Sequence, residues 1–332
     1  MVADPPDGPI SFEYFFLINV PDILEHIFFS LDFCSYKCCL NVSNRWRELL
    51  TSERYIARGK SVFKKDILED ERKLLLCVMY NHTVETKELL ASGMVDINVA
   101  DEKRRTPLHW AAMYGHKEAA QLLIESGAEL NVADRKGRTP LHFATEAWKE
   151  VTEVLINNGA SLNLPDKGGQ TPLHKAVDGG LKYSTQLLIE GGAELNGIDR
   201  YGQTPLYIAV KEASIDIALL LIKHGPDPNV ADNHGQTPLH WAAQRGHTEV
   251  AQSLIETGSE IDAVDNNGCT PLHQAAMCGC KGVVQVLIES GADLKISDGN
   301  GRSPLQMAAR RGYKDIAKLL SKNEKKLTKS QK

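Results

Sequence analysis

A four-residue motif recurs along the sequence at a nearly constant interval. Thr-Pro-Leu-His occurs five times, and the altered copies Thr-Pro-Leu-Tyr and Ser-Pro-Leu-Gln continue the series, so that seven motifs begin at residues 106, 139, 171, 204, 237, 270 and 303. Successive motifs lie 33 residues apart, except for one step of 32. Repeats of this length bury their apolar faces on their neighbours, so the chain is expected to form a stack of similar units rather than one closed core.

Each unit is predicted to contain two helices followed by an extended hairpin. Thr106 is a favourable N-cap, and Pro107 then falls at the first helical position, where its missing N–H costs nothing. The second helix is expected to end before Gly127, because a left-handed residue is favoured there. The recurring histidine, first seen as His109, is expected to make structural hydrogen bonds at the corner between hairpin and helix, because the histidines of neighbouring units are too far apart to share a metal.

This pattern resembles the ankyrin repeat, over residues 71–322. The resemblance implies an all-α solenoid of about eight helix-turn-helix-plus-hairpin units, with altered first and last units that cap the ends. The unit beginning at Thr139 is one residue short around Ala147 and Trp148, where the usual Gly-His pair is missing, and a distorted turn is expected. A polar tail at 323–332 is expected, with fraying from Ser321 onward.

The period is absent before residue 70, which indicates a separate module at 12–58 and a linker at 59–70. Apolar residues follow helical spacing behind a proline, and this small module is expected to complete its burial on a partner. The pairs Val20-Pro21, Ile23-Leu24, Ile27-Phe28, Leu31-Asp32, Val42-Ser43 and Trp46-Arg47 are similar to an F-box. That resemblance implies docking onto the adaptor subunit of a cullin-RING ubiquitin ligase through Pro21, Ile23, Leu24, Ile27, Phe28, Leu31, Val42 and Trp46. The alternative is an unrelated helical cap for the solenoid.

The hairpin tips of the first four full units are mostly basic, although the protein carries a net charge of −5. The predicted target surface comprises Lys103, Arg105, Tyr114, Arg135, Lys136, Arg138, Lys167, Arg200 and Tyr201. A row of positive charges would favour binding of an acidic or phosphorylated segment of a target protein. The alternative is that these exposed tips are charged only for solubility.

Several function classes are disfavoured. The acidic charge balance gives no reason to expect nucleic-acid binding, and no apolar stretch is long enough to span a membrane. Seven cysteines without disulfide spacing and the absence of a basic signal sequence indicate a cytoplasmic or nuclear protein. The cysteines near residues 34–39 and 269–280 are better explained as buried thiols than as zinc ligands. No catalytic motif is present and no cofactor is expected, so the sequence predicts a non-catalytic substrate receptor of a ubiquitin ligase, or else an ankyrin scaffold without a ubiquitin role.

Overall fold

The computed structural model describes residues 69–146 and 148–330, with side chains up to residue 326. The chain divides into two units, Met1–Leu68 and Glu69–Lys332, and only the second unit contains described residues. The F-box-like module at 12–58 and its eight predicted docking residues therefore lie outside the described residues.

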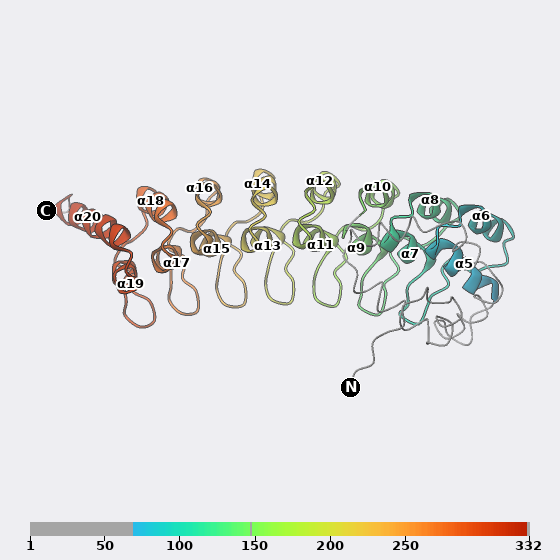
Figure 1. Cartoon of the computed structure of the whole chain (residues 1–332), viewed down its shortest axis with the longest axis horizontal. Coiled ribbons are helices and arrows are strands. Elements are labelled where there is room, and N and C mark those ends of the chain that lie inside the picture. The colour runs from blue at the N-terminus through green and yellow to red at the C-terminus, as the bar shows by residue number, and fades with distance from the viewer. Residues whose placement is uncertain (1–68, 147, 331–332) are drawn as a thin grey trace, which may run out of the picture. The chain divides into compact units, whose positions relative to one another are not determined.

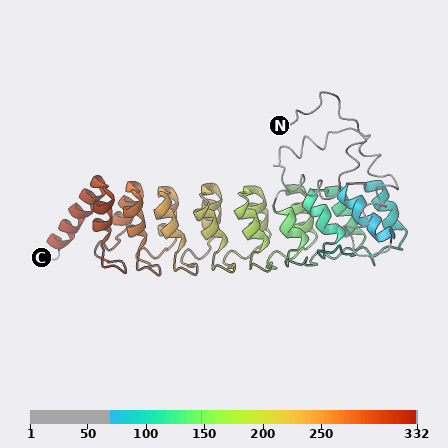
Figure 2. The same cartoon turned by 60° about the horizontal axis from the view of Figure 1, so that its bottom comes forward.

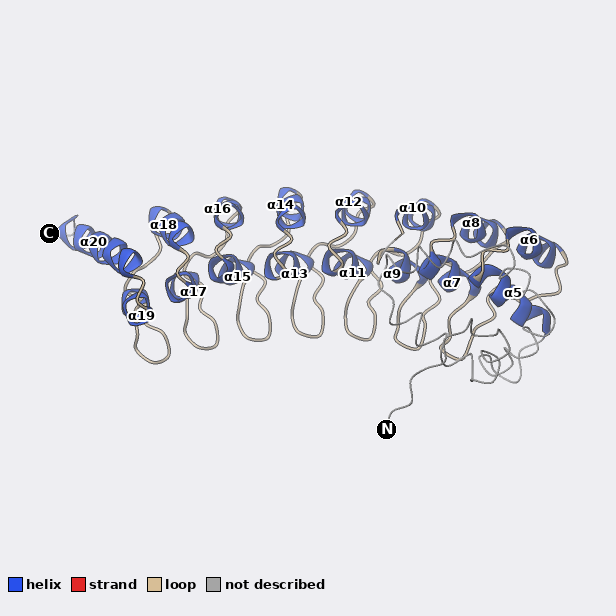
Figure 3. Cartoon of the chain, viewed as in Figure 1, coloured by secondary structure: helices blue, strands red, loops and turns tan. Residues whose placement is uncertain are grey.

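The described residues form eight successive helix pairs and contain no β-strand (Figures 1 and 3). The first helices of the pairs are α5 (Glu69–Met79), α7 (Pro107–Tyr114), α9 (Pro140–Ala144), α11 (Pro172–Asp178), α13 (Pro205–Lys211), α15 (Pro238–Arg245), α17 (Pro271–Cys278) and α19 (Pro304–Arg311). The second helices are α6 (Thr83–Ala91), α8 (Lys117–Glu125), α10 (Lys149–Asn157), α12 (Lys182–Glu190), α14 (Ile215–Lys223), α16 (Thr248–Glu256), α18 (Lys281–Glu289) and α20 (Lys314–Ser330). The expected all-helical repeat architecture is confirmed.

Two parallel rows of helices make up this array, and the loops between units project along one edge (Figures 1 and 2). Each helix packs mainly on its own partner and on the equivalent helices of the units before and after it, as α15 does on α13, α16 and α17. In the six inner units, from α7 to α18, each helix has one fully buried leucine between the rows. The fully buried leucines include Leu108, Leu141, Leu173, Leu206, Leu239 and Leu272 in the first helices, and Leu123, Leu155, Leu188, Leu221, Leu254 and Leu287 in the second. The core is therefore a line of small, nearest-neighbour contacts.

The Thr-Pro pair starts the first helix of a unit in the predicted way. Thr106 is the N-cap of α7, Pro107 is its first residue, and Gly115 ends it in the left-handed conformation with a φ of 73°. Only glycine adopts this conformation without strain, and it turns the chain into α8. The same arrangement recurs at Thr237 and Gly246 of α15.

The C-terminal end differs from the frayed tail expected from the sequence. Helix α20 continues without interruption to Ser330. Neither glycine nor proline occurs after Gly312, and the lysine, glutamate and leucine that dominate the segment are good helix formers. Ile316 and Leu320 on this helix are buried, so its first turns close the open end of the array.

Candidate protein-binding surface

The recurring histidines tie each unit to the next. The backbone N–H of Thr106 donates to Nδ1 of His109 over 3.0 Å, and Nε2 of His109 donates to the carbonyl of Arg138 in the following unit over 3.1 Å. Burial lowers the pKa of His109 to about 4, so the ring is neutral near pH 7. Equivalent bonds are made by His142, His174, His240 and His273. The predicted structural role of these histidines is confirmed.

An aspartate shapes each inter-unit loop of the described array, and six of these seven aspartates are buried. Oδ1 of Asp134 accepts the backbone N–H groups of Lys136 over 2.7 Å and Arg138 over 2.9 Å, and the Asp134 N–H donates to the carbonyl of Arg138. The same double acceptance at Oδ1 is made by Asp101, Asp166, Asp199, Asp232, Asp265 and Asp298. The sequence shows these aspartates at a spacing of 33 residues with one step of 32, but their role in fixing the tips was not predicted.

Backbone hydrogen bonds join the tips of consecutive loops in a row. The N–H of Arg135 donates to the carbonyl of Lys103, and the N–H of Lys167 donates to the carbonyl of Lys136, each over 2.8 Å. The next such bond joins Arg200 to Gly168 over 2.8 Å. We call Lys103, Arg135, Lys136, Lys167 and Arg200 the basic row; all five side chains are exposed.

Two of the predicted target-binding arginines do not belong to this row. Arg105 is only 7% exposed, because its Nε donates to Oδ2 of Asp101 over 2.7 Å and its guanidinium lies 3.9 Å from the ring centroid of Trp110. Arg138 bonds Oδ2 of Asp134 in the same way and lies 4.1 Å from the Phe143 ring. Their placement at the tips was wrong, since the loop turns the fourth residue after the aspartate back to the loop's base.

The two predicted tyrosines have different surroundings. Tyr114 is half-buried and stacks on Trp110 with ring centroids 5.7 Å apart, at the end of α7. Tyr201 is 50% exposed at a loop tip, and its hydroxyl accepts a hydrogen bond from Arg200 over 2.6 Å. Tyr201 therefore extends the basic row with an accessible aromatic ring.

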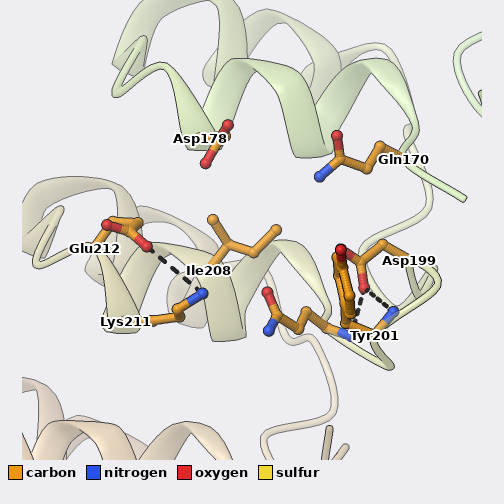
Figure 4. Close-up of a pocket in the computed structure, with 8 residues that line it drawn as sticks. Gln170, Asp178, Asp199, Tyr201, Ile208, Lys211 and Glu212 are labelled. Carbon is orange, nitrogen blue, oxygen red and sulfur yellow. Dashed lines mark hydrogen bonds and ion pairs between the residues drawn. The ribbon is translucent and has the colours of Figure 1, made fainter. Parts of the chain in front are cut away.

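A pocket of about 330 Å³ lies between α11 and α13, beside Tyr201 (Figure 4). Its lining residues are Gln170, Asp178, Asp199, Tyr201, Gln203, Ile208, Lys211 and Glu212. It joins the loop tips to the exposed side of the first helices, and three of its lining residues are carboxylates.

Trp148 replaces the missing Gly-His pair of the short unit. Its indole N–H donates to the carbonyl of Met113 over 2.8 Å, just as Nε2 of His116 donates to the carbonyl of Met79 over 3.1 Å. The indole lies across Gly115, where a Cβ atom would come within 2.3 Å of the ring. The bond to the preceding unit is therefore kept despite the deletion.

Comparison with protein families identifies both parts of the chain. The family model described as ankyrin repeats (3 copies) matches residues 74–166, 147–232, 225–298 and 258–331. The chain belongs to the ankyrin-repeat family. The model of the F-box domain matches residues 17–57 of this ankyrin-repeat protein, as its sequence predicted. No curated protein matches the chain.

Ankyrin and F-box domains are typically non-catalytic binding modules. In the described part of the ankyrin array, no three His, Cys, Asp or Glu side chains meet in a way that would hold a metal ion. Both ring nitrogens of His273 are engaged in hydrogen bonds, and burial raises the pKa of the Cys269 thiol to about 11. Among the same residues, no helix combines the length and apolarity needed to cross a membrane.

Proposed function

We propose that this protein is the substrate-recognition subunit of an SCF-type cullin-RING ubiquitin ligase. The observation that carries the proposal is the F-box match at residues 17–57 in the same chain as a long ankyrin array. In this role the F-box docks on the adaptor subunit, which links it to the cullin. The ankyrin array captures the protein to be ubiquitinated. The complex is assigned to the cytoplasm, the nucleus or both.

Docking is assigned to the apolar residues that the F-box pattern singles out, namely Pro21, Ile23, Leu24, Ile27, Phe28, Leu31, Val42 and Trp46. An exposed apolar helical face in a module of this size is best buried by a partner. Target capture is assigned to the basic row together with Tyr114 and Tyr201, because these side chains differ between units while the histidines and aspartates that hold the units together recur in most of them. An acidic or phosphorylated segment of the target fits this row by charge.

The docking test is co-purification of the full chain with adaptor and cullin. Replacement of Ile23→Asp together with Leu24→Asp should abolish co-purification, because two charges would have to be buried in the interface. The matched control, Lys117→Asp with Gln121→Asp, places two aspartates on exposed positions of α8 and should leave it unchanged. Retention of adaptor and cullin by the first variant would refute the ligase role and favour an ankyrin scaffold without a ubiquitin function.

The target-surface test is binding of a labelled glutamate- and phosphoserine-rich peptide across a salt series. Arg135→Glu with Lys136→Glu should weaken binding at low salt, whereas Lys281→Glu with Lys314→Glu, on exposed positions of α18 and α20, should not. Arg138 is unsuitable for charge reversal, because a glutamate there would face the buried Asp134 and destabilise the loop. Peptide binding that does not depend on salt would refute the acidic-ligand assignment. Equal peptide binding by the basic-row variant and by the control variant on α18 and α20 would also refute it.

A further inference from the structure

The second oxygen of each loop aspartate has a variable partner. Oδ1 always accepts two backbone N–H groups, whereas Oδ2 depends on whichever side chain the unit supplies. The Oδ2 contacts are Asp101 with Arg105 at 2.7 Å, Asp134 with Arg138 at 2.9 Å, Asp166 with Lys175 at 3.5 Å, Asp232 with Tyr207 at 2.6 Å, Asp265 with Gln274 at 3.4 Å and Asp298 with Arg302 at 2.6 Å. In these six units Oδ2 of the aspartate is thus matched by a donor from within the chain.

Asp199 is the exception among these seven aspartates of the described array. It is only 5% exposed, and Oδ1 accepts the N–H groups of Tyr201 and Gln203, but Oδ2 has no hydrogen bond or ion pair. The sequence explains the gap. The fourth residue after this aspartate is Gln203 rather than arginine. The ninth residue is Ile208, which cannot donate a hydrogen bond from its side chain. The ninth residue after Asp166 is Lys175 and the ninth after Asp265 is Gln274, and each of these contacts Oδ2 of its aspartate.

Asp199 lines the pocket between α11 and α13 (Figure 4). Asp178 and Glu212 add two further carboxylates to the lining, on the α11 and α13 sides. The lining also includes one cation, Lys211, whose Nζ is 3.7 Å from Oε1 of Glu212 rather than on Asp199. The pocket therefore combines an excess of negative charge with a carboxylate oxygen that has no partner within the chain.

We propose that this pocket, which we call the Asp199 pocket, receives a cationic side chain, arginine or lysine, from the bound target. Within the chain, Arg105, Arg138 and Arg302 show how such a group sits against the equivalent carboxylate. The methylene stem of the incoming residue would lie along Ile208, with Tyr201 as the accessible wall. A charge-assisted bond to a buried carboxylate is among the stronger single contacts that a surface can offer.

This inference rests on the proposed function, because it assigns a target residue to the array's binding surface. It also refines the target's chemistry. The basic row spans the tips up to Arg200, and the Asp199 pocket opens beside its last member. A target segment that is acidic along the basic row and carries one basic residue at the Asp199 pocket would match the charge of both surfaces.

The test uses random peptides displayed on phage and selected against the full chain. Arginine or lysine should be enriched at one position, and the selected peptides should bind about tenfold or more weakly to Asp199→Asn. A second variant, Gln203→Arg, builds the internal partner that Asp101, Asp134 and Asp298 already have. It should raise the melting temperature and block the same peptides. The matched control is Gln236→Arg, one unit further on, where Tyr207 already occupies Oδ2 of Asp232; it should change neither property.

Selected peptides without an enriched basic residue, or peptides that bind Gln203→Arg as well as they bind the unchanged chain, would overturn the proposal. So would a library that yields no binder dependent on Asp199. Should Asp199→Asn fail to fold, Gln203→Arg decides alone, because it leaves the loop's Oδ1 bonds in place. Adaptor co-purification is read separately, so failure of the ligase role and failure of the Asp199 pocket remain distinguishable.

Discussion

Mild acidification should destabilise the array through its buried histidines. Burial lowers the pKa of His109 and His142 from 6.5 to about 4, and it also lowers the pKa of His174, His240 and His273. Nδ1 of each ring accepts a backbone N–H and therefore has no room for a proton. The unfolded chain takes up these protons below its ordinary histidine pKa while the folded chain does not.

The sign and the pH window follow from these values. A base whose pKa is lower in the folded state contributes its full stability above pH 6.5 and loses it as the pH falls toward about 4. For one histidine shifted from 6.5 to about 4, the loss at about pH 5 is about 2 kcal/mol. His109 and His142 together should therefore remove about 4 kcal/mol, a large part of a typical folding free energy. Asp298, whose pKa its hydrogen bond with Arg302 lowers from 3.8 to about 2, contributes its full stability above pH 3.8 and loses it only as the pH falls below that value, so it does not add to the loss at about pH 5.

The assay is urea unfolding of the full chain by far-UV circular dichroism at about pH 7.5 and about pH 5. The matched variant is His109→Gln, because the last unit already uses Gln306 in this position, where its Oε1 accepts the N–H of Ser303 over 2.9 Å. At about pH 7.5 the variant should be less stable by about 1 kcal/mol, since the bond to the Arg138 carbonyl is lost. At about pH 5 this deficit should vanish or reverse, because glutamine does not titrate.

Two results would refute this reasoning. An unfolding midpoint that is equal at both pH values would mean that the buried rings are not held neutral. A midpoint that falls equally in the unchanged chain and in His109→Gln would mean that another group causes the pH dependence.

Two further predictions concern the packing between units. Gly115→Ala should lower the free energy of unfolding by more than about 2 kcal/mol, because the added Cβ would lie 2.3 Å from the Trp148 ring. Gly127 has a φ of 93° and open space around it, so Gly127→Ala should lower it only by the left-handed backbone strain of about 1 kcal/mol. Equal melting temperatures of the two variants would contradict the close approach of Trp148 to Gly115. Deletion of residues 303–332 should lower the melting temperature or cause aggregation, because it removes the buried Met307, Ile316 and Leu320. Deletion of residues 324–332 should leave the melting temperature nearly unchanged. Similar melting curves for the two truncations would contradict the capping role of the last unit.

Much of the fold could be predicted because it is specified locally. Thr-Pro fixes where a helix begins, and the period fixes where the next one must pack. The end of α20 could not be predicted in the same way. The polar composition after Ser321 indicated fraying, but a segment without glycine or proline continues a helix once Ile316 and Leu320 anchor its first turns.

The binding surface was harder to predict, because side chains a few residues apart in the same loop face different surroundings. Lys136 and Arg138 are two residues apart and both basic, yet the first is exposed at the tip and the second is bonded to Asp134 at the base. The signal that could have separated them is the recurring spacing of an aspartate followed four residues later by an arginine, at 101 and 105, 134 and 138, and 298 and 302. Such a spacing indicates an internal ion pair rather than a free cation.

The loop aspartates also explain how this array can vary its surface without losing its shape. Oδ1 bonds only backbone N–H groups, so the tip residues between the aspartate and the next Thr-Pro or Ser-Pro pair can change while the loop keeps its form. Oδ2 bonds side chains, so its partner changes with the sequence, from arginine to lysine to tyrosine to none. Oδ1, which bonds the backbone, thus preserves the stack, and Oδ2, which bonds side chains, is where units become chemically different. Recognition of one target over another is therefore expected to depend on units in which Oδ2 has no side-chain partner from within the chain. In the described array, Asp199 is the loop aspartate without such a partner.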